Sequence, residues 1–326
     1  MALSGDARMG FVYDGDDVNL NSRARVTFTL SGETDGGLAF GGSFRADNAT
    51  GAAAGSAGSV FISGEFGRLS MGDVDSAALA ATGDLFSVGL TGLGDLHEMQ
   101  YVGRLFNDVD GTANAISAAF ADANGDPVPT VVTGLSAFPR ALYTYSIDGF
   151  SVHASVAFDK SRNVTATFPT DPPVSFGGTA NVVEASIGAS YELDGFMVAA
   201  GYENARIKLE DFDPTVDGTL NLGHATVAAG YTIEGVSIKA IYGRAMDDLA
   251  DLVEDKNQYG LGVSGSFDAV TVSAYGRRDF AKTQYLGVGA SYDLGGGASI
   301  RGGVVNTNPK GSSSTTIADF GLAFTF

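Results

Sequence analysis

The sequence predicts an all-β protein, a 16-stranded antiparallel transmembrane β-barrel whose long third loop folds into the interior. Three observations predict this class. Apolar and polar residues alternate along segments of ten residues or more, tight turns recur with similar flanks, and longer polar connections separate them. Side chains alternate between the two faces of a strand, and about 9–11 tilted residues cross a bilayer. Strands of a soluble β-sandwich are usually shorter, at about 5–6 residues.

The composition fits this class and argues against several others. Apolar residues make up 44% of the chain and charged residues only 17%, below the roughly 25% of soluble domains. Yet no run of about 18 apolar residues predicts a transmembrane helix. Acids outnumber bases by 38 to 19, so we expect no nucleic-acid partner, because phosphates attract Lys and Arg. The absence of Cys excludes disulfides and thiolate zinc sites.

The alternation is clearest in three segments. From Val183 to Leu193 every odd position is apolar and every even position is Glu, Ser or Gly. The segments 3–13 and 318–326 repeat the pattern, and aromatic residues gather near segment ends on the apolar face. Aromatic girdles lie at such places in membrane barrels. We therefore expect one face of each strand to meet lipid and the other to meet water.

The turns fix the order of the strands. Asp-Gly or Glu-Gly pairs at 148–149, 194–195 and 234–235 stand between alternating segments, which is a strong hairpin pattern. Longer polar connections follow at 159–181, 207–218, 244–256 and 306–315. We expect a single barrel domain over residues 1–326, wide enough to enclose an aqueous channel. Its predicted strands are 3–14, 22–32, 38–47, 59–66, 68–74, 140–147, 150–158, 182–193, 196–206, 219–233, 236–243, 257–267, 270–279, 283–294, 298–306 and 316–326.

One connection, residues 75–139, is far longer than the others. A loop of this length in a compact domain is usually functional. Its apolar residues need an inner wall to pack on, which favours a loop folded into the barrel; the alternative is a solvated excursion outside it. We expect five of its acids to form the acidic side of a constriction: Asp84, Asp95, Glu98, Asp108 and Asp110.

Arginines on the polar faces of the first and last strands predict a basic wall opposite the loop. They are Arg8, Arg23, Arg25, Arg45 and Arg301. The alternative is a set of scattered surface arginines. Alternation argues against this alternative, because an arginine on the outward face of a strand would meet lipid. That costs about 2–4 kcal/mol at the membrane midplane. Clustered like charges need carboxylates nearby, and the loop is the only dense source that the sequence offers. Fixed charges of both signs across a narrow aqueous gap give a transverse field.

Several motifs resemble one family. They are L-S-G-D-A-R-M-G (3–10), S-R-A-R-V-T-F-T-L-S-G (22–32), G-D-L-F-S-V-G (83–89), Y-D-L-G-G-G-A-S-I (292–300) and the terminal Phe326. The chain resembles the general diffusion porins of purple bacteria, the Rhodobacter type of alphaproteobacterial outer-membrane porin. The resemblance implies a homotrimer in the bacterial outer membrane, with the third loop folded inward at an eyelet. Arg8, Arg23, Arg25 and Arg45 fall on the family's motif positions.

The resemblance also makes calcium a candidate ligand, because the third loop sometimes holds this ion in the family. Here N-D-V-D-G-T (107–112) and D-A-N-G-D (122–126) look like fragments of oxygen-ligand loops. Asp108 and Asp110 are the candidate ligands. Neither fragment has a full ligand set, and ordinary turn chemistry is the favoured explanation of both. No cofactor is required by this interpretation.

The expected function is passive, weakly selective diffusion of small hydrophilic solutes and ions, with a mild preference for cations, and no enzymatic activity. Membrane lipid, lipopolysaccharide and two further copies of the chain are the expected partners. The first residues lack the basic start and apolar stretch of a signal peptide. We expect either a mature outer-membrane chain with an added Met or a cytosolic protein, and the barrel pattern favours the first.

Two alternatives stay open at this stage. A channel specific for a sugar or another small solute would need aromatic residues along the lumen, and only Tyr275 and Tyr285 are placed there by the pattern. An outer-membrane Ser-His-Asp hydrolase would use one of the three His residues, but no nucleophile elbow accompanies them.

Overall fold

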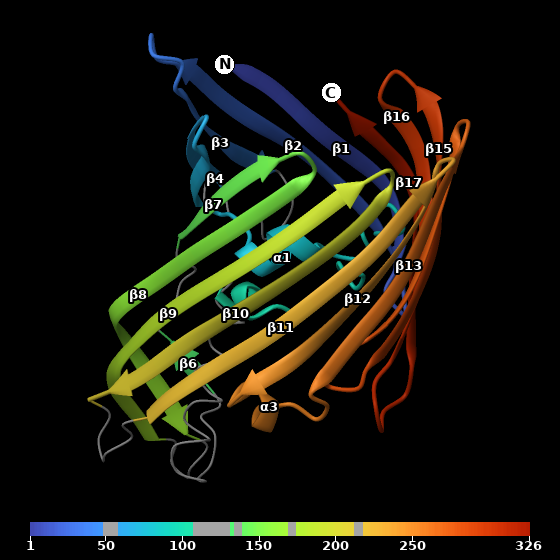
Figure 1. The fold of residues 1–326 in the computed structure, drawn as a ribbon. Coiled ribbons are helices and arrows are strands. Elements are labelled where there is room, and N and C mark those ends of the chain that lie inside the picture. The colour runs from blue at the N-terminus through green and yellow to red at the C-terminus, as the bar shows by residue number, and fades with distance from the viewer. Residues whose placement is uncertain (48–57, 107–130, 134–138, 169–173, 212–217) are drawn as a thin grey trace.

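A closed antiparallel barrel forms the body of the protein (Figure 1). The computed structural model describes residues 1–47, 58–106, 131–133, 139–168, 174–211 and 218–326. Within these residues, seventeen strands form one sheet, and the first and last strands pair to close it. Sixteen of them make the barrel wall in chain order, while the short strand β6 pairs only with the far end of β8. The predicted 16-stranded barrel is confirmed.

Each wall strand runs antiparallel to its neighbours in the sequence. The strands are β1 (Ala2–Tyr13), β2 (Val18–Glu33), β3 (Ala39–Asp47), β4 (Gly58–Gly64), β5 (Gly67–Gly72), β6 (Val131–Thr133), β7 (Arg140–Ile147), β8 (Phe150–Phe168), β9 (Val174–Leu193), β10 (Phe196–Glu210), β11 (Gly218–Ile233), β12 (Val236–Asp247), β13 (Asn257–Phe267), β14 (Val270–Arg278), β15 (Gln284–Gly295), β16 (Ala298–Asn308) and β17 (Thr315–Thr325).

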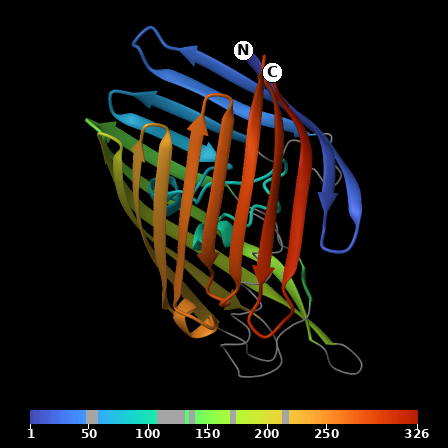
Figure 2. The same ribbon diagram turned by 90° about the vertical axis from the view of Figure 1, so that its right-hand side faces the viewer.

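The two-residue turns and both chain ends lie at one rim of the barrel, called here the short-turn rim (Figures 1 and 2). The turn between β7 and β8 shows why Asp-Gly stands there. Asp148 and Gly149 both have positive φ, 48° and 80°, as the favoured two-residue hairpin turn demands. Asp194 and Gly195 repeat this geometry between β9 and β10. The opposite rim, called the long-loop rim, carries the connections from β5 to β7 and from β12 to β13.

The outer face of the wall is apolar, as the alternation predicts. Phe11, Ile187 and Leu286 on three distant strands are exposed by 55%, 63% and 67%. Large apolar side chains at this exposure are costly in water and favourable in lipid. Among the described residues, no helix is both long enough and apolar enough to cross a membrane.

The predicted strand bounds hold closely except at the long-loop rim. β8 continues to Phe168 and β9 begins at Val174, so much of the predicted connection 159–181 is paired strand. Polar residues such as Asp159 and Asn163 interrupt the apolar alternation there. Backbone pairing does not need an apolar outer face once a strand has passed beyond the lipid, so the pattern ended before the strand did.

The connection between β5 and β7 contains regular structure of its own. It holds the short helix α1 (Ala77–Thr82), the 3₁₀ helix η1 (Val102–Phe106) and strand β6. A second short helix, α3 (Leu249–Leu252), lies between β12 and β13. Figures 1 and 2 show α1 enclosed by the wall strands. Residues 73–106 are called the inner segment below.

Candidate pore lining and constriction

The inner segment is bonded to the inward faces of the strands. The backbone N–H groups of Ala77 and Ala78 donate to the hydroxyls of Ser155 on β8 and Ser186 on β9, at 2.9 and 2.8 Å. Gly188 lets α1 come this close, because a Cβ built there would lie 2.3 Å from the Ala77 carbonyl oxygen. Small and polar residues on the inner wall therefore form the surface on which α1 packs.

Glu203 on β10 joins the two ends of the inner segment. Its carboxylate accepts hydrogen bonds from the Ser76 hydroxyl at 2.9 Å and from the backbone N–H groups of Val102 and Gly103. It also lies 2.9 Å from Nδ1 of His224 on β11, and neither Glu203 nor His224 is exposed. A buried carboxylate is tolerated only when its oxygens are bonded, and here the bonds hold the loop.

Two further contacts extend this anchor. Gln258 on β13 exchanges two hydrogen bonds with the backbone of Gln100, at 2.9 and 2.6 Å, and its amide nitrogen lies 3.1 Å from Nε2 of His224. On the other side, Arg140 of β7 pairs with Glu184 of β9 at 2.6 Å and donates to the Gly103 carbonyl oxygen at 2.7 Å. These charged and amide side chains fix the inner segment against β7, β9 and β13.

A third anchor lies on the last strand. The carboxylate of Asp319 on β17 accepts hydrogen bonds from the backbone N–H groups of Leu90 and Thr91, at 2.8 and 2.7 Å, and from the Thr91 hydroxyl at 2.7 Å. The inner segment thus spans the interior from β7 to β17. Its apolar residues are buried against the wall, as the sequence predicted: Leu85, Val88, Leu90, Leu93, Met99 and Tyr101.

Four of the five predicted arginines share the inner face of the first three strands. The register places Arg8 opposite Arg23, and Arg45 opposite Thr27, two residues beyond Arg25. Arg301 lies on β16 and is separated from Arg8 by β17. Its guanidinium donates to the Ser299 hydroxyl at 3.0 Å. Arg8, Arg23, Arg25 and Arg45 are called the basic wall below.

The carboxylates that compensate the basic wall are not those that the sequence suggested. Asp6 pairs with Arg23 at 2.7 Å, and Asp47 pairs with both Arg25 and Arg45 at 2.9 Å. The expectation that the loop alone could supply these partners is wrong for these three arginines. The register puts Asp6 and Asp47 on either side of Arg25, and strand pairing of this kind is invisible in a single strand's alternation.

The loop acids that the structure describes are partly engaged within the loop. Asp84 pairs with Arg104 and accepts the backbone N–H of Met99 at 2.8 Å. Glu98 lies 3.4 Å from Arg104. Burial raises the pKa of Glu98, and the Arg104 charge acts in the opposite direction. Asp95 is exposed and has a positive φ of 56°.

The other two predicted loop acids, Asp108 and Asp110, lie outside the described residues. The calcium prediction rests on them and stays a prediction from the sequence. Among the residues that the structure does describe, no three His, Asp or Glu side chains are placed together to hold a metal ion.

The structure adds Arg68 on β5 to the inward-facing arginines. Its guanidinium lies over the ring of Phe61, 3.6 Å from the centroid, and donates to the Ser70 hydroxyl at 3.1 Å. The alternation test could have found it, because Leu69 and Met71, which alternate with Arg68 and Ser70, are exposed on the outer face. The same test marks Glu203 and Asp319 as inward-facing, but only the folded structure shows that they hold the inner segment.

An apolar outer face, a charged inner wall and a loop bonded across the interior define a channel-forming barrel of the outer membrane. The sequence profile of the Gram-negative porins matches residues 1–312. The chain belongs to the Gram-negative porin family. The predicted function is confirmed at this level: the protein is a general diffusion porin of the outer membrane and not an enzyme.

Individual relatives agree with this assignment. The porin of Rhodobacter capsulatus is 36% identical over 99% of both chains, and that of Fuscovulum blasticum is 26% identical over the full length of both. A porin structure refined at 1.8 Å superposes with a TM-score of 0.69 at 32% identity, covering 100% of this chain and 99% of the other. A variant of the Rh. blastica porin has a TM-score of 0.60 over the same shares, at 22% identity, and supports the fold alone.

Proposed function

We propose that the narrowest part of the channel lies between the basic wall and the inner segment. The observation that carries this proposal is the one-sided anchoring of the inner segment, which side chains of β7–β17 hold and which leaves the basic wall accessible. The side chains of Arg23, Arg25 and Arg45 are exposed by 17%, 24% and 41%. The wall and the segment approach at Arg8, whose Nη1 lies 3.5 Å from the Thr91 carbonyl oxygen. Small hydrophilic solutes pass through the remaining aqueous gap.

Cysteine modification tests this placement, since the chain has no Cys of its own. Arg45→Cys in a planar bilayer is treated with a bulky, neutral thiol reagent, and the single-channel conductance is followed. Added bulk at a constriction blocks current, so we expect a clear fall. Ile187→Cys, on the outer face, is the matched control and should keep its conductance. An unchanged conductance in modified Arg45→Cys would place the constriction elsewhere.

The inner segment contributes the opposite charge in this proposal. Asp95 is exposed and Glu98 is half-buried, so both carboxylates can act on ions in the gap. Asp108 and Asp110 stay in the proposal on the sequence alone. Four arginines with two wall carboxylates leave the basic wall with a positive excess. Charge of both signs across the gap makes the channel weakly selective.

We also propose that the barrel assembles as a homotrimer through the outer faces of β1–β3. Small residues are present there, namely Ala7, Ala24, Gly42 and Ala46, and such residues let two protein surfaces approach closely. Light scattering in detergent tests this and should give three copies per particle. A monomer alone at all protein concentrations would contradict it. Lipopolysaccharide is the proposed neighbour at the long-loop rim, which would show as retained lipid phosphate in purified protein.

A further inference from the structure

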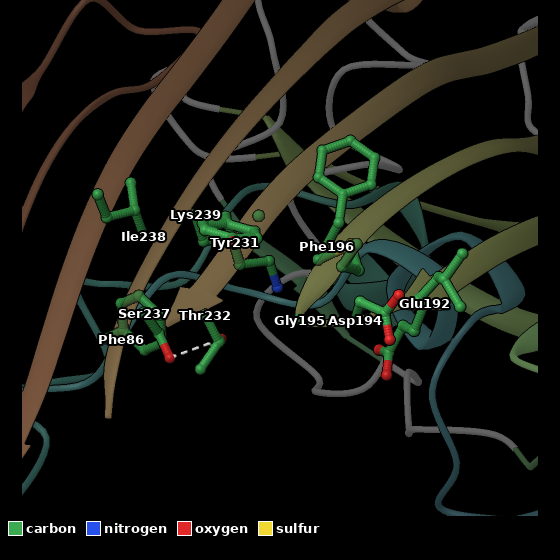
Figure 3. A pocket seen from close by; sticks show the side chains of 13 residues that line it. Phe86, Glu192, Asp194, Gly195, Phe196, Tyr231, Thr232, Ser237, Ile238 and Lys239 are labelled. Carbon is green, nitrogen blue, oxygen red and sulfur yellow. Dashed lines mark hydrogen bonds between the residues drawn. The ribbon is translucent and has the colours of Figure 1, made fainter. Parts of the chain in front are cut away.

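A cavity of about 440 Å³ opens on the inner side of the wall near the short-turn rim (Figure 3). The ends of β9, β10, β11 and β12 form it, and Phe86 of the inner segment closes one side. The anchors described above do not use it, and it lies away from the basic wall. Its lining combines three kinds of group: one ammonium, carboxylates and apolar side chains.

Among the described residues that line the cavity, Lys239 on β12 is the only cation. No hydrogen bond or ion pair joins its ammonium to any other residue in the described part of the chain. In Figure 3 its nitrogen is directed into the space between Thr232 and Ser237 on one side and Glu192 and Asp194 on the other. The ammonium also reaches the inner segment, since a Cβ built on Gly83 would lie 2.9 Å from it. A half-buried cation without a bonded partner is costly, which favours an anionic group of a ligand.

The carboxylates in the cavity are placed for a cationic group. Glu192 is the last inward-facing residue of β9, and Asp194 follows in the turn, where its φ is 49°. Asp84 and, more weakly, Glu192 act electrostatically on Lys239, but neither forms an ion pair with it. Neither the Glu192 nor the Asp194 carboxylate is bonded to another side chain within the described residues. Separated charges of opposite sign suit a ligand that carries both.

The remaining wall is apolar with one hydroxyl pair. Phe86 packs on β13, where a Cβ built on Gly262 would lie 3.0 Å from its ring. Met197 of β10 lines the cavity and is partly buried. The hydroxyls of Thr232 and Ser237 satisfy each other at 2.8 Å, so they do not compete for Lys239. An apolar group of a ligand can cover Phe86 and Met197 without displacing any bond.

We propose that this cavity is a weak binding site for zwitterionic α-amino acids with apolar side chains. The α-carboxylate pairs with the Lys239 ammonium, the α-ammonium pairs with Glu192 and Asp194, and the side chain packs on Phe86 and Met197. Charge-assisted hydrogen bonds are stronger than neutral ones, but exposure of Glu192 and Asp194 to water weakens them. The site goes beyond unselective diffusion, because it holds one class of solute near the short-turn rim.

The test measures reduction of single-channel current by L-leucine added at the short-turn side of a planar bilayer. We expect current to fall with leucine concentration and to saturate. Hexanoate and hexylamine carry one charge each on a similar apolar chain. Each should need a concentration about tenfold higher, since one charged contact is lost. Current that does not respond to leucine, or that responds equally to hexanoate or hexylamine, would overturn the proposal.

Variants assign the effect to the cavity. Lys239→Met should raise the half-blocking leucine concentration by about tenfold, whereas Lys239→Arg should keep most of the block. Lys208→Met, on β10 but outside the cavity, is the matched control and should behave as the wild type. If Lys239→Met does not assemble, Glu192→Gln with Asp194→Asn tests the same site through the ammonium contact. If leucine blocks these cavity variants at the wild-type concentration, the proposal is wrong. Their conductance in salt without leucine shows separately whether the channel itself is intact.

Discussion

Glu203 and His224 lie on neighbouring strands with Oε1 and Nδ1 2.9 Å apart, and neither residue is exposed. The pair belongs to a chain of bonds that runs from Ser76 through Glu203 and His224 to Gln258. Each side chain in it either holds the inner segment or orients one that does. Buried polar groups of this kind are strongly interdependent, because removal of one leaves its neighbours without partners. The position of the inner segment therefore depends on residues of the wall.

Glu203→Ala should loosen the inner segment without opening the barrel. The backbone N–H groups of Val102 and Gly103 lose their acceptor, at a cost of about 1–3 kcal/mol for each buried group. We expect noisier single-channel currents and a lower temperature of unfolding in detergent. Glu210→Ala is the control, because the Glu210 carboxylate is 37% exposed and pairs with an exposed lysine. Equal noise and equal melting in both variants would argue against the anchoring role.

Arg23→Gln with Arg25→Gln should raise the preference for cations. Each change leaves its wall carboxylate, Asp6 or Asp47, with less compensation, so the wall loses its positive excess. We expect the cation-to-anion permeability ratio to rise by about twofold and the conductance to increase. The measurement is the reversal potential across a salt gradient at low ionic strength, where screening is small.

A second pair of changes makes this prediction specific. Adding Asp6→Asn and Asp47→Asn to the same chain removes the exposed negative charge and should return the reversal potential towards the wild-type value. If the arginine variants alone leave both the reversal potential and the conductance unchanged, ions do not pass along the basic wall.

Asp95→Asn with Glu98→Gln should move selectivity towards anions. Both carboxylates are accessible and were predicted to form the acidic side, whereas Asp84 is bonded to Arg104 and to the backbone of Met99. Asp84→Asn should therefore disturb the loop before it changes selectivity. Reversal potentials for both variants, compared with current noise, separate the two effects. A selectivity change confined to Asp84→Asn would contradict the proposed acidic side.

The interior charge pattern shows how far the sequence predicts this protein. Alternation placed every wall strand and put Arg8, Arg23, Arg25 and Arg45 on the inner face, since both follow from a period of two. It could not pair Arg25 with Asp47, because that contact depends on the register between β2 and β3. The sequence also could not predict the anchoring role of Glu203, because Ser76 and Val102 contact it only in the folded chain, where the inner segment crosses the interior.

As the pH is lowered, the ion selectivity should begin to change at a higher pH than it would if every loop carboxylate were exposed. Burial raises the pKa of Glu98, so this group takes up a proton, and loses its negative charge, at a higher pH than an exposed Glu. Lowering the pH should therefore reduce the cation preference first through protonation of Glu98, at a pH where most other carboxylates stay ionised. Reversal potentials measured from neutral to mildly acid pH should show this step in the wild type. Glu98→Gln should lack it, and a step that persists in this variant would assign it to another group.

Removal of Phe326 should impair closure of the barrel. The backbone of Phe326 exchanges two hydrogen bonds with Gly5, at 2.9 and 3.3 Å, which extend the pairing of β17 with β1. Their loss costs about 0.5–1.5 kcal/mol each, and the deletion also removes an aromatic ring at the short-turn rim. Phe326→Leu keeps the backbone bonds and separates the two contributions. We expect the deletion to lower the amount of heat-modifiable barrel in the outer membrane well below that of Phe326→Leu. Wild-type amounts after the deletion would show that the seam between β1 and β17 closes without its last residue.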